Sequence, residues 1–218
     1  MTETKTVILV AWDNETEHSL SDADKQRLDD NNIEIVYTGI GKINATRAIT
    51  DLVVRNEYES KMDLHIVNVG CAGSHTTGVR TLIKPNNFIQ RDMDARQFGY
   101  ERYHTPEESN WIVDGDELQF ISRFNFCFYR EETVVCATGD NANGYSETSD
   151  SVPAFDAVDM EAYAFAHVCA YYGVKFTCYK WITDLAAETS TIKELIENNK
   201  LLPWTQIIDE ILSLDWLA

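Results

Sequence analysis

Short apolar runs rich in β-branched residues recur along the chain, and segments with helical spacing separate several of them. Residues 6–12, 33–38 and 64–69 have the composition of buried strands. Residues 44–56 and 161–172 have the spacing of helices with one apolar face. This alternation is typical of a mostly parallel sheet whose two faces are both covered by helices. The sequence therefore predicts an α/β fold.

Further strands are expected over 88–91, 133–137 and 174–183, and a closing helix over 204–214, whereas 111–130 shows no clear pattern. Small or acidic residues follow the predicted strands, at Trp12-Asp13, Gly39, Gly70, Gly139-Asp140 and Thr183-Asp184. In α/β folds, ligands bind beyond the carboxyl ends of the strands. We therefore expect a ligand site at this edge of the sheet.

The size and charge of the chain limit what it can bind. With 218 residues, of which 44% are hydrophobic, it can form a single domain over residues 1–218. The 18 lysines and arginines are outnumbered by 36 acidic residues, which gives a formal net charge of -18. Such a charge repels nucleic acid and anionic membranes, so we expect neither as a partner.

The cellular compartment is predicted from the cysteines and from the apolar segments. The five cysteines form no CxxC pair, and most lie in apolar runs, as small core residues do in a reducing compartment. The N-terminus lacks the features of a signal peptide, and no segment is long and apolar enough to span a membrane. A cytoplasmic protein is expected.

The sequence predicts neither a metal site nor a bound cofactor. None of the five histidines has metal-ligand spacing with another histidine, cysteine or carboxylate. The loop Gly39-Ile40-Gly41 follows a predicted strand, but a dinucleotide fingerprint would need glycine where Asn44 stands. A tight turn that packs a helix against a strand is the better interpretation.

Two carboxylates are candidates for chemistry at the predicted site. Asp184 stands where a buried strand should emerge, and partial burial would raise its pKa, as a general acid requires. Its alternative role is a helix N-cap. The run Asp159-Met160-Glu161 is expected to open a helix, where the dipole favours the carboxylate of Glu161 whether or not it binds a ligand.

A run of small residues, Gly70-Cys71-Ala72-Gly73, is expected to form a turn at the end of a buried strand. Small residues at such a turn allow either close packing or the approach of backbone amides to a ligand. The residues alone leave both interpretations open.

Several separated motifs agree with one known family. In chain order they are TGIGKINA (38–45), NVGCAGS (68–74), DARQFGYERYHTP (94–106), ATGD (137–140), VDMEA (158–162) and KWITD (180–184). Together they resemble the purine nucleoside phosphorylase and nucleosidase superfamily, and most closely its methylthioadenosine/S-adenosylhomocysteine nucleosidase branch. The resemblance implies a three-layer α/β/α sandwich around a mixed, mostly parallel sheet, usually in a homodimer. It also implies hydrolysis of the N-glycosidic bond of an adenosine-like nucleoside with a 5′-thio or related substituent.

The resemblance also implies roles for individual residues. Asp184 takes the place of the acid that protonates purine N7, and Glu15 that of the glutamate that orients the attacking water. Glu161 falls where a carboxylate binds the ribose hydroxyls, and Met160 where a methionine lies against the sugar. Further substrate contacts are expected at Trp12, Cys71, Ala72, Gly73, Asn143 and Lys180, and in the 5′ pocket at Phe98, Tyr100 and Pro106, the last supplied by the neighbouring subunit.

The chain departs from the family pattern at some of these positions. Ala142, followed by Asn143, stands where the family has an aromatic residue that stacks on the base, and Cys71 and Lys180 replace a serine and an arginine. Two alternatives to hydrolysis remain: a phosphorylase, and a nucleoside-binding module without turnover. The acidic stretch 13–17 disfavours the phosphorylase, because it would repel phosphate where phosphorylases carry an arginine.

Overall fold

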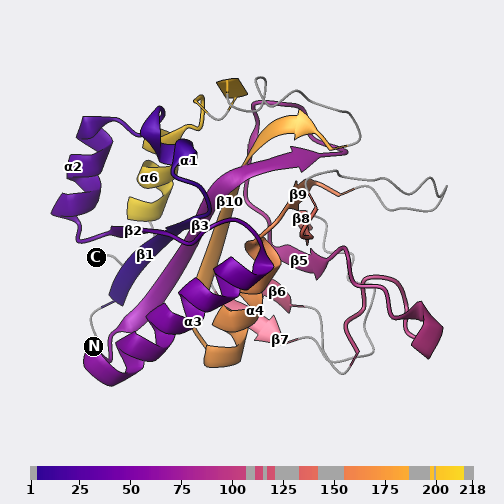
Figure 1. Cartoon of the computed structure of the whole chain (residues 1–218). Helices are drawn as coiled ribbons and strands as arrows, with labels where there is room; N and C mark the ends of the chain where they lie inside the picture. The colour runs from indigo at the N-terminus through magenta and orange to yellow at the C-terminus, as the bar shows by residue number, and fades with distance from the viewer. Residues whose placement is uncertain are drawn as a thin grey trace.

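The structure is a computed structural model, which describes residues 4–106, 111–114, 117–120, 133–141, 155–186, 197–198 and 200–213 (Figure 1). Side chains are described for all of these residues except those of 111–114 and 117–120. The strands in these parts are β1 (Thr4–Val10), β2 (Glu34–Tyr37), β3 (Asp63–Ser74), β4 (Leu82–Ile83), β5 (Asn87–Gln90), β6 (Trp111–Asp114), β7 (Glu117–Phe120), β8 (Val135–Thr138), β9 (Ala157–Asp159) and β10 (Lys175–Leu185). The helices are α1 (Asn14–Glu17), α2 (Asp22–Asp30), α3 (Lys42–Glu59), the 3-10 turn η1 (Arg96–Phe98), α4 (Ala162–Tyr172) and α6 (Trp204–Leu212).

The described strands form one mixed sheet in the order β2-β1-β3-β9-β8-β5-β6-β7, and β10 pairs with both β3 and β4. The pairs β1–β2, β1–β3, β3–β10, β5–β8 and β8–β9 are parallel. The pairs β3–β9, β4–β10, β5–β6 and β6–β7 are antiparallel. The prediction of a mixed, mostly parallel sheet is therefore confirmed.

The side chains of β1 show why helices cover both faces of the sheet. Successive residues of a strand point to opposite faces. Val7 and Leu9 accordingly join a core cluster with α3 and α4, whereas Ile8 and Val10 join a second cluster with α2 and α6. All four side chains are fully buried. These two cores make the three-layer α/β/α sandwich that the resemblance implies.

Helix α4 has the buried stripe and the end that its sequence predicts. Ala162, Phe165, Ala166 and Cys169 are fully buried. Gly173 caps the helix with a φ of 67°, a left-handed conformation that glycine adopts without a steric penalty.

Residues 70–73 do not form the turn that their composition predicts. They continue β3 and pair with β10, in the register Gly70 with Lys180 and Gly73 with Asp184. The pairing shifts by one residue between Ile182 and Asp184, where an irregularity interrupts the ladder. The predicted strand end at Thr183 is thus a bulge within β10, because the extended chain of β3 still offers backbone partners there.

The start of α4 also differs from the prediction. Asp159 does not open a helix; it ends strand β9, and Glu161 is the N-cap residue of α4. The Asp159 side chain accepts a hydrogen bond from Ala162 N at 2.8 Å, so it satisfies one free amide of the first helical turn. The Glu161 side chain makes no capping bond and is available for other contacts.

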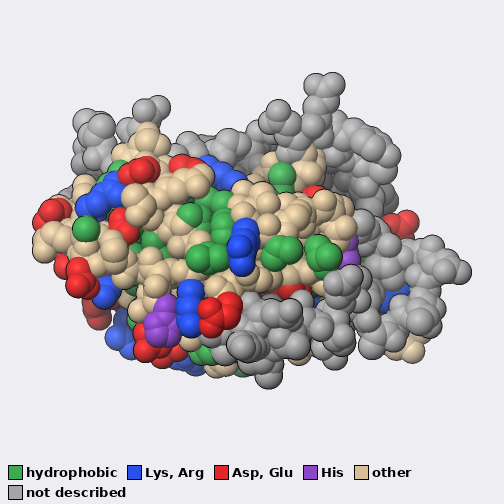
Figure 2. All heavy atoms as spheres, turned by 90° about the horizontal axis from the view of Figure 1, so that it is seen from above, with side chains coloured by type: hydrophobic (Ala, Val, Ile, Leu, Met, Phe, Trp, Pro, Cys, Tyr) green, Lys and Arg blue, Asp and Glu red, His purple; other side chains and the backbone are tan. Residues whose placement is uncertain are grey.

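The described surface carries charges of both signs. Figure 2 shows acidic side chains interspersed with lysines and arginines on one face, rather than gathered in one acidic block. No helix in the described parts of the chain is long and apolar enough to cross a membrane.

Candidate active site

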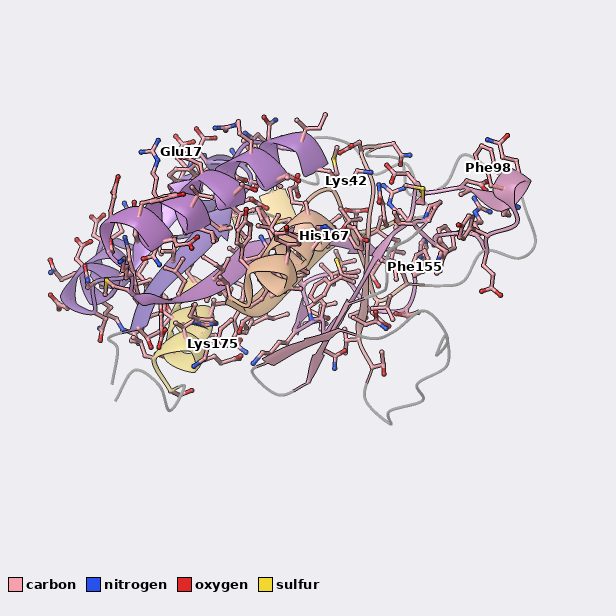
Figure 3. All side chains as sticks on the ribbon, turned by 90° about the horizontal axis from the view of Figure 1, so that it is seen from below. Glu17, Lys42, Phe98, Phe155, His167 and Lys175 are labelled. Atoms are coloured by element: carbon pink, nitrogen blue, oxygen red, sulfur yellow. The ribbon has the colours of Figure 1, made fainter. Side chains whose placement is uncertain are left out.

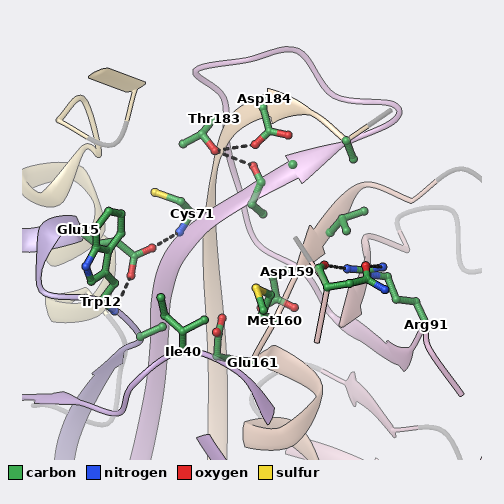
Figure 4. Close-up of a pocket in the computed structure, with 16 residues that line it drawn as sticks. Trp12, Glu15, Ile40, Cys71, Arg91, Asp159, Met160, Glu161, Thr183 and Asp184 are labelled. Atoms are coloured by element: carbon green, nitrogen blue, oxygen red, sulfur yellow. Dashed lines mark hydrogen bonds between the residues drawn. The ribbon is translucent and has the colours of Figure 1, made fainter. Parts of the chain in front are cut away.

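A cavity of about 230 Å³ lies at the edge of the sheet where the sequence predicts a ligand (Figure 4). Its wall combines residues that follow β1, β2, β5 and β8 with residues at the ends of β3, β9 and β10. The lining residues are Ala11, Trp12, Glu15, Ile40, Cys71, Ala72, Gly73, Arg91, Asn141, Val158, Asp159, Met160, Glu161, Thr183, Asp184 and Ala186. Segments far apart in the sequence therefore share one site.

Glu15 is held on one side of the cavity by main-chain groups. Its carboxylate accepts hydrogen bonds from Cys71 N at 2.6 Å and from Trp12 N at 3.2 Å. Trp204 of α6 donates to the Glu15 carbonyl oxygen at 2.9 Å and so fixes its backbone. Burial raises the pKa of Glu15, whereas the two amides and the charge of Lys180 oppose that rise. The carboxylate is thus fixed in position with its acceptor oxygens near the cavity.

Glu161 faces the same cavity from the start of α4. Its Oε1 accepts a hydrogen bond from Gly41 N at 2.7 Å. Gly39 and Gly41 have φ values of 85° and 92°, which glycine readily adopts, and the turn they form presents this amide. Burial, and next the charge of Asp159, raise the pKa of Glu161 to about 7, although Lys180 opposes the rise. The helix start therefore does not keep this carboxyl acidic, contrary to the expectation from the dipole.

A buried ion pair lies behind Glu161. Lys180 Nζ is 2.7 Å from Asp159 Oδ2, and both side chains are 1% exposed. Asp159 also accepts from the Thr138 hydroxyl at 2.5 Å. Burial alone would raise the pKa of Asp159, but the charge of Lys180 and these hydrogen bonds outweigh it and lower the pKa. Lys180 is therefore bound to Asp159 and is not at the cavity wall, where substrate contact was expected.

Asp184 is half-buried at the other end of the cavity. Burial raises its pKa, and a hydrogen bond with Thr183 partly offsets that effect. The Thr183 hydroxyl is 3.0 Å from Asp184 Oδ2 and 3.3 Å from the Ala72 carbonyl oxygen. The hydroxyl is the donor in both contacts, so Thr183 favours the ionised carboxylate, and it is burial that favours the acid form of Asp184.

The structure brings many of the predicted residues together, but not all. Trp12, Glu15, Cys71, Ala72, Gly73, Met160, Glu161 and Asp184 line the cavity. Phe98, Tyr100 and Pro106 do not; Phe98 is 72% exposed and lies at an outer end of the molecule (Figure 3). Asn143 lies outside the described residues.

Two lining residues, Arg91 and Asn141, were missed by the sequence reasoning. Arg91 is the last residue of the predicted strand 88–91, and Asn141 follows the predicted strand end Gly139-Asp140, so the rule that located the other site residues could have found them. Neither has an expected role in the family motifs, and Arg91 is the one cation among the described residues that line the cavity.

The family follows from the comparison with known sequences. The sequence profile of the Phosphorylase superfamily matches residues 25–202, most of the chain. The chain belongs to the phosphorylase superfamily. The match includes every strand from β2 to β10, and therefore most of the cavity wall. Trp12 and Glu15 lie before it.

Several similar proteins are named 5'-methylthioadenosine/S-adenosylhomocysteine nucleosidase. The chain is 26% identical over 197 residues to 5'-methylthioadenosine/S-adenosylhomocysteine nucleosidase of Staphylococcus saprophyticus, covering 86% of this chain and 84% of that protein. It is 27% identical over 179 residues to the protein of the same name from Bacillus thuringiensis, covering 77% and 74%. The Neisseria meningitidis nucleosidase of that name, crystallised with methylthio-immucillin-A, superposes with a TM-score of 0.72 at 19% identity, covering 97% of this chain and all of that one.

Proposed function

We propose that this superfamily member hydrolyses the N-glycosidic bond of a purine nucleoside and releases the free base and the sugar. The observation that carries the proposal is the placement of Glu15, Glu161 and Asp184 around one cavity, each in a different environment. The names of the similar nucleosidases support it.

The chemistry of the bond requires groups of this kind. Its cleavage builds positive charge on the sugar and negative charge on the base. We assign Asp184 as the acid that protonates purine N7, because burial raises its pKa. Glu161 binds the ribose hydroxyls, with Met160 against the sugar. Glu15 orients the attacking water, because its oxygens are already fixed by two backbone amides.

Water is a better nucleophile for this cavity than phosphate. Glu15, Asp159, Glu161 and Asp184 line the cavity. Lys180, behind them, is bound to Asp159, and Arg91, the one cation among the described lining residues, binds Asn141 on the side opposite Glu15 (Figure 4). A phosphate dianion beside the buried carboxylate of Glu15 would face like-charge repulsion. Hydrolysis is therefore preferred over phosphorolysis.

The names of the similar proteins make adenosine-like nucleosides with a 5′-thio substituent the first substrates to assay. Trp12, which lines the cavity, and Asn143 remain our candidates for further substrate contacts. Since Phe98, Tyr100 and Pro106 do not reach the cavity of their own chain, a 5′ pocket would need the whole segment 98–106 from a second protomer.

A homodimer is therefore part of the proposal, and exposed apolar side chains such as Phe98 and Ile43 support it. Truncation by Phe98→Ala should then raise KM for 5′-thio nucleosides more than for the unsubstituted ones. We place the enzyme in the cytoplasm, because Cys71, Cys136, Cys169 and Cys178 are free thiols.

The deciding experiment measures free base and sugar released from a panel of purine nucleosides, with and without phosphate. Free ribose or its 5′-thio derivative, in amounts that phosphate does not change, is the expected result. A phosphate-dependent sugar 1-phosphate would instead identify a phosphorylase. Tight nucleoside binding without any base release would identify a binding module.

A further inference from the structure

The turn of residues 39–41 carries the amide that binds Glu161, and it leads directly into α3. Gly41 is the N-cap residue of α3 and has no side chain that could accept from the free amides of the first helical turn. With φ values of 85° and 92°, Gly39 and Gly41 adopt conformations that are only a few of those open to glycine. Contacts from elsewhere in the fold must therefore fix the position of the Gly41 amide.

Asp140, which follows β8, supplies such a contact. Its Oδ1 accepts a hydrogen bond from Lys42 N at 2.8 Å and so takes the place of a capping side chain. A Cβ atom at residue 41 would stand 3.2 Å from the same oxygen, so the carboxylate packs closely on Gly41. Its negative charge is favourable there, because the N-terminus of the 18-residue helix α3 carries a partial positive charge. Asp140 therefore binds the turn directly beside the amide that Glu161 uses.

Asp140 is itself held by a second carboxylate and by an ammonium group. Asp92, which follows β5, accepts from Asp140 N at 2.9 Å. Lys42 Nζ is 2.6 Å from Asp92 Oδ1 and 3.7 Å from Asp140 Oδ2. Partial burial would raise the pKa of Asp92, but the hydrogen bonds from Lys42 and from Asp140 N outweigh it and lower the pKa. The network of Lys42, Asp92 and Asp140 thus joins the start of α3 to the ends of β5 and β8.

The carboxylate of Glu161 lies on the other side of the turn, where Ile40 and Glu161 are neighbours in the cavity wall (Figure 4). Burial raises its pKa most, and the charges of Asp159 and Glu15 raise it further. The charge of Lys180 and the hydrogen bond from the Gly41 amide lower it. The amide therefore both orients the carboxylate and favours its ionised form.

We propose that Asp140 is a positioning residue, which binds the start of α3 and thereby holds the Gly41 amide against Glu161. Lys42 and Asp92 support it in this role. Asp140 is not among the described residues that line the cavity, so it acts on the substrate only through the turn. This inference rests on the proposed role of Glu161 in binding the ribose.

The test compares Asp140→Ala with Asp140→Asn. Both remove the same negative charge, which by itself would lower the pKa of Glu161, but only asparagine keeps a side-chain oxygen for Lys42 N. Asp140→Ala should nevertheless raise the pKa of Glu161 by about one, because the Gly41 amide is displaced, and Asp140→Asn should not raise it. Asp156→Ala, which removes another carboxylate that accepts a main-chain N–H, is the matched control.

The pKa is measured by NMR titration of glutamate side chains labelled with carbon-13, and the signal of Glu161 is the one that is absent from Glu161→Gln. This readout does not depend on turnover. Thermal melting checks that each variant is folded.

The donor side of the same contact is tested at residue 42. Lys42→Pro and Lys42→Met both remove the ammonium group, and only proline also removes the main-chain N–H. Proline is well tolerated at the first position of a helix, which is where Lys42 lies. The pKa of Glu161 should therefore be higher in Lys42→Pro than in Lys42→Met. This pair decides the question if Asp140→Ala does not fold.

Activity gives a second readout. In Asp140→Ala, kcat/KM for adenosine should fall by about tenfold, and Asp140→Asn should restore most of it. The same ratio for 2′,3′-dideoxyadenosine, which lacks the hydroxyls that Glu161 binds, should change much less. A raised pKa of Glu161 with unchanged kcat/KM for adenosine would overturn the role of Asp140 in the reaction.

The pKa of Glu161 separates this inference from the proposed function. An unchanged or lowered pKa in a folded Asp140→Ala protein, or equal values in the two Lys42 variants, would overturn the positioning role while the proposed hydrolysis stands. If the wild-type protein cleaves no nucleoside but the pKa shifts as expected, Asp140 does hold the turn against Glu161 and the proposed hydrolysis fails.

Discussion

The Asp184 carboxylate lies directly against Gly73: a Cβ atom at residue 73 would stand 2.7 Å from Asp184 Oδ1. It would also stand 3.2 Å from the Ala186 backbone. A contact of 2.7 Å is shorter than real Cβ atoms make, so a side chain at residue 73 must displace the Asp184 carboxylate. The small residues of β3 are therefore matched to the carboxylate on the neighbouring strand.

We predict that Gly73→Ala lowers kcat by about 100-fold, because a displacement of about 1 Å at a catalytic group has effects of that size. Gly78→Ala is the matched control, since a Cβ there meets nothing within 4 Å. Steady-state kinetics with thermal melting separates loss of activity from loss of fold. Unchanged kcat in a folded Gly73→Ala enzyme would contradict the close fit.

Asp184→Asn should lower kcat by about 10² to 10⁴-fold, because the amide cannot supply the proton to the base. Nucleoside binding, measured by calorimetry, should change much less. Asp51→Asn, on the solvent face of α3, serves as the control. Near-wild-type turnover in Asp184→Asn would exclude this residue as the acid.

The pH profile of activity should carry a limb near neutrality. Glu161 binds hydroxyls best when ionised, and burial and the charge of Asp159 raise its pKa to about 7. Asp184 must be protonated to act as the acid, and its burial raises its pKa, so it contributes the other limb. Glu161→Gln should lower turnover and remove the limb near pH 7. A profile with that limb unchanged in the variant would assign it to another group.

Lys180→Met should destabilise the protein by about 3–5 kcal/mol, because it leaves the buried Asp159 carboxylate without its counter-ion. The double variant Lys180→Met/Asp159→Asn should recover a large part of that loss, since the uncompensated charge is gone. Urea unfolding measures both. Equal destabilisation in the single and double variants would show that the loss is one of packing rather than charge.

Much of the fold could be predicted from the sequence, because apolar periodicity is a local property. The runs at 6–10 and 64–69 are strands, although the first was expected to reach residue 12, and the stripe from Ala162 to Cys169 is buried as expected. Residues 70–73 were wrongly assigned as a turn because their extended conformation depends on pairing with β10, about 110 residues away in the chain. Such pairing leaves no local signal.

The candidate site, like the fold, could be predicted only in part from the sequence. Glu15, Glu161 and Asp184 were located from their motifs, but their partners were not. The hydrogen bond from Gly41 to Glu161 joins residues 120 apart, and the Gly-rich turn gave no indication of it. Arg91 was missed because a single arginine at the end of a predicted strand resembles any solvated charge, and only the structure shows that it is buried.

The continuation of β3 through residues 70–73 has a consequence for how the site responds to ligands. The amide of Cys71 that binds Glu15 lies in β3, which pairs with β10, and Asp184 lies in β10 itself, where it pairs with Gly73 of β3. Such amides exchange with solvent only when a large part of the sheet opens. The entropic cost of ordering this wall is therefore incurred when the chain folds, and binding of a nucleoside does not have to order the wall further.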